Sequence, residues 1–341
     1  MGEYTESKTI RWVHVVAAGL TMILAGSCGG SKGPGPTPIP TAPTLTCPAP
    51  FSALAHKGVL PTVTYDTPVA QGGQAPVAVA CNPASGTEFP LGESDVTCTA
   101  TDASNRTGTC DFLVTVDPVP QIAKTKFMAF GDSLTAGTTS PTPTVLVLSV
   151  EDSYPTKLLA MLSTRYVDQS ITVINEGMAG KLVEKDFSRF QDAMRADRPQ
   201  VVLLMEGAND LNTYGSDAIP HIAGSLEQMV RDAKSRGAVV FLATLPPQNP
   251  DGKNGHHAGL LPELNDQIAR TAADEGAILV DLYRELGTWR GYIGADGLHP
   301  TAEGYQRIAE IWRDAIQEQF EKGGGASGLP APQLTLAIPG R

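Results

Sequence analysis

Residues 124–320 alternate short apolar runs with segments of helical periodicity, and this alternation constrains the fold more than any other feature of the chain. The expected strands are nearly continuous apolar runs, as in parallel strands that are covered on both faces. They span residues 126–130, 171–174, 201–205, 238–244 and 277–282. Apolar residues at helical spacing predict helices over 153–165, 181–196, 216–236, 261–275 and 301–320. Strand and helix in alternation predict an α/β fold with a doubly wound parallel sheet.

Unusual polar residues follow the first, second, third and fifth of these expected strands. They lie in residues 131–137, 175–180, 207–210 and 296–300. Ligands of doubly wound sheets bind outside the carboxyl ends of the strands, so these segments should meet at one edge. Together they offer a serine, a histidine, a carboxylate and donors for an oxyanion, which acyl transfer requires.

Each of these residues has a chemical role that fits its type. Ser133 lies in a turn flanked by glycines, His299 can act as a general base near neutral pH, and Asp296 is close enough to orient its ring. The Asn209 amide and the backbone N–H groups of Gly180 and Ser133 predict an oxyanion hole. Taken singly, each segment also fits a structural turn or a helix cap. Their order, and their placement at strand ends, favours a catalytic site.

These segments resemble the motifs of the GDSL or SGNH hydrolase family. Ser133, Gly180, Asn209 and His299 match the four residues that give SGNH its name, and Asp296 matches the acid of the triad. The resemblance covers nearly all of residues 126–320. It implies a flavodoxin-like sheet, the SGNH hydrolase fold, and ester hydrolysis through an acyl-enzyme without a metal or cofactor. Gly177 is the alternative to Gly180 if the loop is shifted.

Residues 45–117 carry short β-branched runs separated by turn residues, a pattern typical of a small all-β immunoglobulin-like sandwich. Four cysteines fall inside this region without the spacing of a zinc site. Two disulfides are therefore expected, in any of three pairings, among Cys47, Cys81, Cys98 and Cys110. Residues 81–116 resemble the HYR (hyalin repeat) module, which implies a role in adhesion or as a spacer.

The first 27 residues have the pattern of an export signal. Lys8 and Arg11 precede an apolar run over 12–25, which is too short as a helix to span about 30 Å of hydrocarbon. The small residues before Cys28 resemble the lipobox of bacterial lipoproteins, in which this cysteine becomes the lipidated N-terminus. A free cysteine in a cleaved or retained leader is the alternative.

Two segments rich in Gly and Pro complete the expected organisation. Residues 28–44 are expected to form an extended tether and residues 321–341 a disordered tail. We therefore expect an exported protein that its lipid holds at the cell envelope, in the periplasm or on the outer surface.

The charge balance limits the possible partners. The chain has 25 Lys and Arg against 36 Asp and Glu, a net charge of −11, and no basic run. This excludes nucleic acid as an expected partner. It also leaves attachment to the membrane to the lipid rather than to electrostatic attraction.

The sequence leaves the substrate and the oligomeric state open. Short-chain acyl or acetyl esters, on small molecules or extracellular glycans, are the first expectation. A lysophospholipase or thioesterase type of lipid deacylase and a non-catalytic surface adhesin are the alternatives. Residues 138–150 form an apolar insertion that predicts either a wall of an acyl pocket or a packed loop. His256 and His257 are expected in a solvated or substrate-lining loop rather than as a metal pair, because no carboxylate or thiol ligands accompany them.

Overall fold

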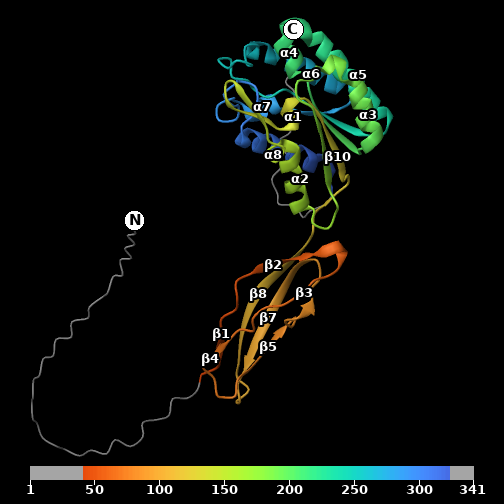
Figure 1. Ribbon diagram of the computed structural model, residues 1–341. Coiled ribbons are helices and arrows are strands. Elements are labelled where there is room, and N and C mark those ends of the chain that lie inside the picture. Colours follow the sequence, from red (N-terminus) through yellow and green to blue (C-terminus); the bar gives the residue numbers. More distant parts are fainter. Residues whose placement is uncertain (1–40, 323–341) are drawn as a thin grey trace, which may run out of the picture.

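The computed structural model describes residues 41–322, which form a β-module followed by an α/β unit (Figure 1). The expected export signal, Cys28, most of the tether and the tail from residue 323 lie outside the described residues. The two units touch at Asp168 of the α/β unit, whose carboxylate accepts the Lys57 N–H at 2.7 Å and contacts His56 Nδ1 at 3.0 Å. Among residues 41–322, no helix combines the length and the apolar character needed to cross a bilayer.

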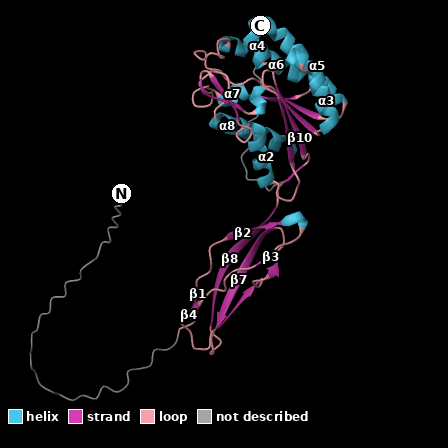
Figure 2. Ribbon diagram, in the orientation of Figure 1, coloured by secondary structure: helices cyan, strands magenta, loops and turns pink. Residues whose placement is uncertain are grey.

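The β-module is built around one four-stranded sheet (Figure 2). Its strand order is β2 (Phe51–Ala55), β8 (Thr107–Pro118), β7 (Gly92–Thr101) and β5 (Ala78–Asn82). Two short pairs complete the module: β1 (Thr44–Leu45) with β4 (Ala70–Gln71), and β3 (Thr62–Val63) with β6 (Thr87–Glu88). Side chains along β7 and β8 alternate between more and less buried, because successive residues of a strand point to opposite faces.

Two disulfides close this module. Cys81 and Cys98 lie opposite each other across β5 and β7 and are bonded, and Cys47 is bonded to Cys110 of β8. The structure thus selects one of the three pairings that the sequence left open. The strand register places Cys98 opposite both Cys81 and Cys110, and Cys98 bonds to Cys81 while Cys110 bonds to Cys47.

The α/β unit contains a five-stranded parallel sheet. Its order is β13 (Thr172–Gly177), β10 (Lys126–Gly131), β14 (Val201–Met205), β15 (Val239–Ala243) and β16 (Ile278–Val280). In chain order this is 2-1-3-4-5, the flavodoxin-like order, so the predicted fold class is confirmed. The chain places β13 on one side of β10 and then crosses over to place β14 on the other side. β10 therefore has parallel partners on both sides.

Helices cover both faces of this sheet. The first group contains α2 (Tyr154–Arg165), α7 (Leu282–Leu286) and α8 (Ala302–Phe320), and α8 contacts both of the others. The second contains α3 (Phe187–Asp197), α5 (Ile219–Ser235) and α6 (Leu261–Glu275), and α5 contacts both of the others. Two short helices, α1 (Ser133–Ala136) and α4 (Ala208–Tyr214), follow β10 and β14 directly. Strand ends at this edge therefore run straight into helix N-termini.

Local sequence explains where the long helices begin and which side they bury. The Thr301 hydroxyl caps α8 by accepting the Gly304 N–H, and Ser153 caps α2 in the same way. The helical stripe that the sequence predicts on α8 is buried against the sheet, with Trp312 fully buried. Its ring lies 5.9 Å from that of Tyr154 and 6.5 Å from that of Phe241, measured between centroids. This cluster joins α2 and α8 to the sheet.

Three predicted segments differ from the structure. The helix expected over 181–196 begins as the 3-10 turn Val183–Lys185 and becomes α3 only at Phe187, while the one expected over 216–236 starts with the 3-10 turn Gly215–Ala218. The insertion at 138–150 is a β-hairpin, formed by β11 (Thr138–Thr142) and β12 (Val145–Leu148).

The start of the predicted tail is wrong by two residues. Glu321 and Lys322 form β17, which pairs with β9 (Gln121–Ile122) at the entrance to the α/β unit. The Glu321 carboxylate also binds the Arg165 guanidinium and the Tyr166 hydroxyl. These pairings hold the end of α8 against the linker, the segment of β9 that joins the β-module to the α/β unit. Composition alone does not reveal this contact.

Candidate active site

Ser133, Asp296 and His299 come together at the carboxyl end of the sheet. Ser133 is the first residue of α1 directly after β10, and His299 lies just before α8. His299 Nε2 is 2.8 Å from Ser133 Oγ, and His299 Nδ1 is 2.6 Å from Asp296 Oδ2. All three residues are buried, with exposed fractions of 4% or less. A hydrogen-bonded relay therefore connects the serine hydroxyl to a carboxylate that lies away from solvent.

The Asp296 carboxylate is held ionised by its donors. Burial opposes its charge, but hydrogen bonds from the side chain and backbone N–H of His299 and from the Asn254 amide keep its pKa below the usual range for aspartate. Its backbone N–H donates to Ser140 Oγ at 3.0 Å. An ionised carboxylate at this position fixes the imidazole tautomer that leaves Nε2 free to accept the serine proton.

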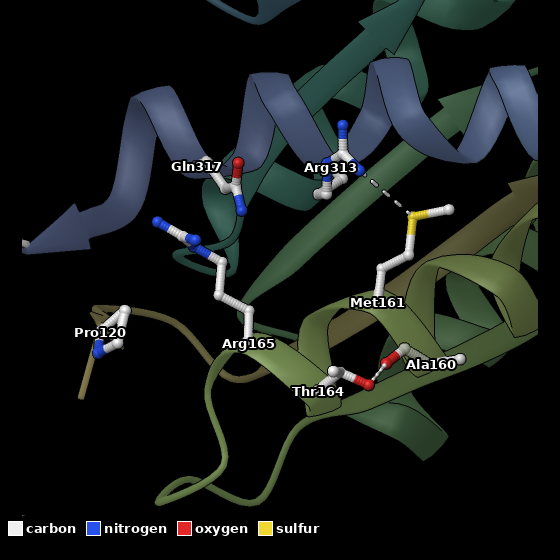
Figure 3. A pocket seen from close by; sticks show the side chains of 7 residues that line it. All are labelled: Pro120, Ala160, Met161, Thr164, Arg165, Arg313 and Gln317. Carbon is white, nitrogen blue, oxygen red and sulfur yellow. Dashed lines mark hydrogen bonds between the residues drawn. The ribbon is translucent and has the colours of Figure 1, made fainter. Parts of the chain in front are cut away.

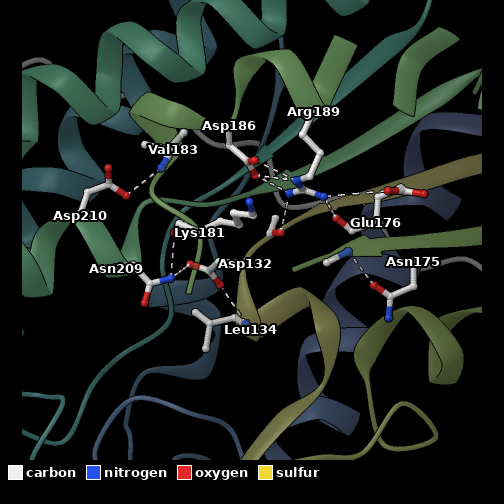
Figure 4. A network of polar contacts seen from close by, with 12 residues as sticks. Asp132, Leu134, Asn175, Glu176, Lys181, Val183, Asp186, Arg189, Asn209 and Asp210 are labelled. Atoms are coloured by element: carbon white, nitrogen blue, oxygen red, sulfur yellow. Dashed lines mark hydrogen bonds and ion pairs between the residues drawn. The ribbon is translucent and has the colours of Figure 1, made fainter. Parts of the chain in front are cut away.

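The predicted oxyanion donors lie in one cavity with Ser133. Gly180 has a φ of +77°, and a side chain at this position would meet no atom within 4 Å, so its backbone is open to a ligand. Asn209 Nδ2 donates to the Lys181 carbonyl at 2.9 Å and lies 3.4 Å from Asp132 Oδ2 (Figure 4). The longer of these two contacts is weak, and Asn209 lines the cavity together with Ser133 and Gly180.

Gly177, the alternative to Gly180, has a different environment. Its backbone packs against α1, and a Cβ would lie 2.1 Å from the Ala136 nitrogen. Its N–H donates to Asn175 Oδ1 at 2.9 Å. Gly177 is therefore committed to close packing between β13 and α1, and Gly180 is the glycine that lines the cavity.

The cavity around Ser133 has a volume of about 280 Å³ and is lined by both apolar and polar side chains. Its apolar lining residues are Leu146, Ala179 and Leu298. Its other lining residues include Thr138, Asn209, Asn212, Thr213, Asn254 and His256. His256 thus lines the cavity, as one reading of the sequence expected. Within the described part of the chain, no three His, Cys, Asp or Glu side chains are grouped so as to hold a metal ion.

Sequence reasoning missed Asp132, the buried residue that precedes the serine. Its carboxylate caps α1 by accepting the Leu134 N–H at 2.9 Å. Burial raises the pKa of Asp132 to about 6, although the Leu134 hydrogen bond favours the charged form. An aspartate at the start of a short helix is a capping signal, and this signal was available in the sequence.

Sequence reasoning also missed a network of charged side chains next to the site, at the carboxyl ends of β10 and β13 (Figure 4). Arg189 donates to the carbonyls of Glu176 at 2.6 Å and Gly131 at 3.1 Å, and it pairs with Asp186. Its guanidinium also lies 3.9 Å from the Phe130 ring centroid. One side chain thus ties the carboxyl end of β10 to that of β13, next to the serine turn.

Glu206, at the end of β14, belongs to the same region. Neither carboxylate oxygen has a hydrogen-bond donor among the described residues. Burial raises the pKa of Glu206 well above the usual value, and the negative charges of Asp132 and Asp186 add to this effect. A charged residue directly after a fully apolar strand is the sequence signal that marks this position.

A larger cavity of about 620 Å³ lies elsewhere, between the linker and the C-terminal halves of α2 and α8 (Figure 3). Pro120, Met161, Arg165 and Arg313 are among its lining residues. It contains no histidine, carboxylate or predicted site residue. The smaller cavity at Ser133 is therefore the candidate active site, because it brings Ser133 together with His299, whereas the residues that line the larger cavity include no histidine or carboxylate.

Comparisons with known proteins agree with this architecture. Residues 129–307 match the GDSL-like lipase/acylhydrolase family, and residues 40–116 match the HYR domain. An arylesterase of Vibrio mimicus is 28% identical over 191 residues, which cover 55% of this chain and 86% of that protein. A multidomain esterase of Ruminococcus flavefaciens is 26% identical over 137 residues, 39% of this chain. The chain spans only 18% of the length of that second relative.

A solved structure shares the fold of the α/β unit. The lipase/acylhydrolase from Enterococcus faecalis covers 59% of this chain and 100% of its own, with a TM-score of 0.50 and 23% identity. The family match extends over more than half of the chain and includes the turn of Ser133 and the loop of His299. The chain therefore belongs to the GDSL-like lipase/acylhydrolase family.

Proposed function

We propose that the protein is a serine esterase that hydrolyses carboxylic esters through an acyl-enzyme on Ser133. The observation that carries this proposal is the hydrogen-bonded series Ser133 Oγ, His299 and Asp296, with contacts of 2.8 and 2.6 Å in a buried site. In this geometry the Ser133 hydroxyl can transfer its proton directly to His299 Nε2.

The proposed reaction has two halves. Ser133 Oγ attacks the ester carbonyl carbon while His299 Nε2 takes the hydroxyl proton, and His299 then gives that proton to the leaving alkoxide as the C–O bond breaks. A water molecule attacks the acyl-enzyme in the second half, again giving its proton to His299, which returns it to Ser133 Oγ as the acid departs. The ionised Asp296 stabilises the imidazolium that forms in both halves.

The tetrahedral oxyanion would bind to three donors. These are the N–H groups of Ser133 and Gly180 and the side-chain amide of Asn209, all of which border the cavity. Ser133 N–H lies at the N-terminus of α1, where helix N–H groups have no partner within the helix. Donors that are fixed before the reaction stabilise the developing charge without reorganisation.

For the substrate, we propose an ester of a hydroxylated alcohol, such as a small polyol or an acylated extracellular glycan. Support comes from the lining of the cavity, which Asn254 and His256 share with His299, and from the Asn254 amide, which donates to the Asp296 carboxylate. The leaving oxygen must reach His299, so the alcohol would lie near these polar side chains. Short acyl or acetyl groups remain the first expectation for the acid part of the ester.

The test is labelling and turnover of the full chain. A fluorophosphonate probe should label wild type but not Ser133→Ala, and hydrolysis of p-nitrophenyl acetate should fall in the variant by on the order of 10⁶ in kcat. Equal hydrolysis by both proteins would overturn the mechanism. No labelling and no turnover of the folded wild type would favour the alternative of a non-catalytic surface adhesin.

We also propose that the protein is exported and anchored at the cell envelope through a lipid on Cys28. The charged start, short apolar run and small residues before Cys28 support this proposal. The two disulfides of the β-module support export as well, because such bonds persist in oxidising compartments. The HYR module would then act as a spacer or adhesion unit between the anchor and the esterase.

A further inference from the structure

The hairpin that follows the nucleophile exposes an unusual amount of apolar surface. Between 45% and 62% of each side chain is exposed in Val145, Leu146, Val147 and Leu148, which make up β12. No residue from 138 to 150 carries a charge. Contiguous exposed apolar side chains of this kind mark binding surfaces more often than chance.

The stem of this hairpin is fixed to the active site. The Tyr305 hydroxyl donates to the Thr138 carbonyl at 2.7 Å, and the Ala295 N–H donates to the Ser140 carbonyl at 3.0 Å. On the other strand side, the Ser149 N–H donates to the Gly137 carbonyl at 2.9 Å. Hydrogen bonds on both strand sides of the hairpin therefore set the position of β12 relative to Ser133.

One face of the hairpin belongs to the catalytic cavity. Leu146 and Thr138 line that cavity together with Ser133. Leu148 lies opposite Thr138 in the strand register and is two residues from Leu146, so it lies on the same face. Val147 lies between them and points to the other face. Leu148 thus extends the apolar face of Leu146 beyond the residues that line the cavity.

We propose that Leu146 and Leu148 bind the acyl chain of the substrate, so that the preferred esters carry an acyl group longer than acetyl on a polar alcohol. This inference rests on the proposed esterase function. The acyl carbon is bonded to Ser133 in the acyl-enzyme, so its chain must leave the cavity from Ser133. The strip of Leu146 and Leu148 gives that chain a surface that excludes water, and burial of each methylene contributes about 0.8 kcal/mol, a gain of about fourfold in kcat/KM.

Docking of the hairpin onto a lipid surface fits the same apolar residues less well. Glu151 and Asp152 directly follow the hairpin, and the whole chain carries a net charge of −11. Both features disfavour approach to an anionic bilayer. Moreover, a surface that only docked onto lipid would not need Leu146 inside the cavity of the nucleophile.

The experiment compares Leu146→Ser with Val147→Ser, neighbouring residues of similar exposure on opposite faces of β12. The readout is kcat/KM for monomeric p-nitrophenyl acetate, butyrate, hexanoate and octanoate. A second series keeps the acyl group as acetyl and lengthens the alcohol from ethyl to hexyl. We expect wild type to favour octanoate over acetate, Leu146→Ser to lower this ratio by about tenfold, and Val147→Ser to change it less than twofold.

Other results would overturn the inference while leaving the esterase proposal intact. These are an active wild type with a flat acyl-length profile, equal effects of the two variants, or a preference that follows the alcohol length instead. Effects of both variants that appear only with phosphatidylcholine and phosphatidylglycerol vesicles or micelles would assign the hairpin to lipid docking. Absence of any turnover, together with no fluorophosphonate labelling at Ser133, would instead refute the esterase proposal itself.

Discussion

Ser140 Oγ accepts a hydrogen bond from the backbone N–H of Asp296 at 3.0 Å, across 156 residues of sequence. Ser140 lies in β11 of the hairpin, and Asp296 carries the carboxylate that orients His299. The segment after the nucleophile is therefore fastened to the loop that holds the other two members of the triad. The apolar hairpin and the Asp296 carboxylate are therefore parts of one hydrogen-bonded structure.

Loss of the hydrogen bond between Ser140 and Asp296 should disturb the position of Asp296 more than the overall fold. In Ser140→Ala the buried N–H of Asp296 loses its acceptor, which costs about 1–3 kcal/mol. We expect a lower Tm and a loss in kcat that exceeds any change in KM. Thr142→Ala, at an exposed position of the same strand, is the matched control and should retain wild-type values. Unchanged kcat in Ser140→Ala would show that the loop holds Asp296 without this bond.

Asn209→Ala should lower kcat by about 10²–10³, the usual effect of removing one oxyanion donor. KM should change much less, because the donor acts mainly on the charge of the transition state. Tyr214→Phe, at the far end of α4, serves as control for perturbation of the helix. An increase in KM with unchanged kcat would assign Asn209 to ground-state binding instead.

Asp132 predicts a pH dependence of stability. Burial raises its pKa in the folded protein to about 6 from an ordinary value of 3.8, so the folded state holds its proton more tightly than the unfolded state. Its contribution to stability is therefore full below about pH 4 and is lost as the pH rises through 6, by about 3 kcal/mol at most. Asp132→Asn should flatten urea-derived stability between pH 4 and 7. A variant with the wild-type slope would contradict this assignment.

The disulfides should stabilise the β-module without serving catalysis. Residues 124–320 contain no cysteine, so reduction should leave ester turnover intact while it lowers the unfolding temperature of the module. The loop closed by Cys47–Cys110 spans 63 residues and that by Cys81–Cys98 spans 17. Chain entropy then predicts losses of about 4 and about 3 kcal/mol for the respective double Cys→Ala variants. Calorimetry measures the unfolding transitions of the β-module and of the α/β unit. A parallel loss of ester turnover would show that the two units are coupled.

Cys28→Ala should release the protein from membranes. The lipid supplies the attachment in our proposal, because the acidic chain has little affinity for anionic bilayers. Fractionation of cells that express each form, with mass spectrometry of the N-terminal peptide, checks this expectation. A wild-type protein found with an unmodified Cys28 in the soluble fraction would argue for an ordinary leader. Ser133→Ala is the control, since it should fractionate like wild type.

Much of the fold could be predicted because its signals are local. The five strands of the α/β unit lie within a few residues of their expected positions, since buried parallel strands have continuous apolar runs. The candidate residues Ser133, Asn209 and His299 were found because topology brings the carboxyl ends of parallel strands to one edge. The hairpin at 138–150 was missed as a secondary structure, because threonine, proline and valine fit both strands and irregular loops.

The sequence by itself determined the order of units, the alternation of strands and helices, and the set of polar residues at the strand ends. Only the tertiary structure decided which cysteines pair, that Gly180 rather than Gly177 lines the cavity, and that Arg189 binds the ends of two strands. It also placed Leu146 beside Ser133. The physical reason is that periodicity and capping act within a few residues, whereas these contacts depend on strand register and on packing between distant segments, as between His299 and Ser133, 166 residues apart.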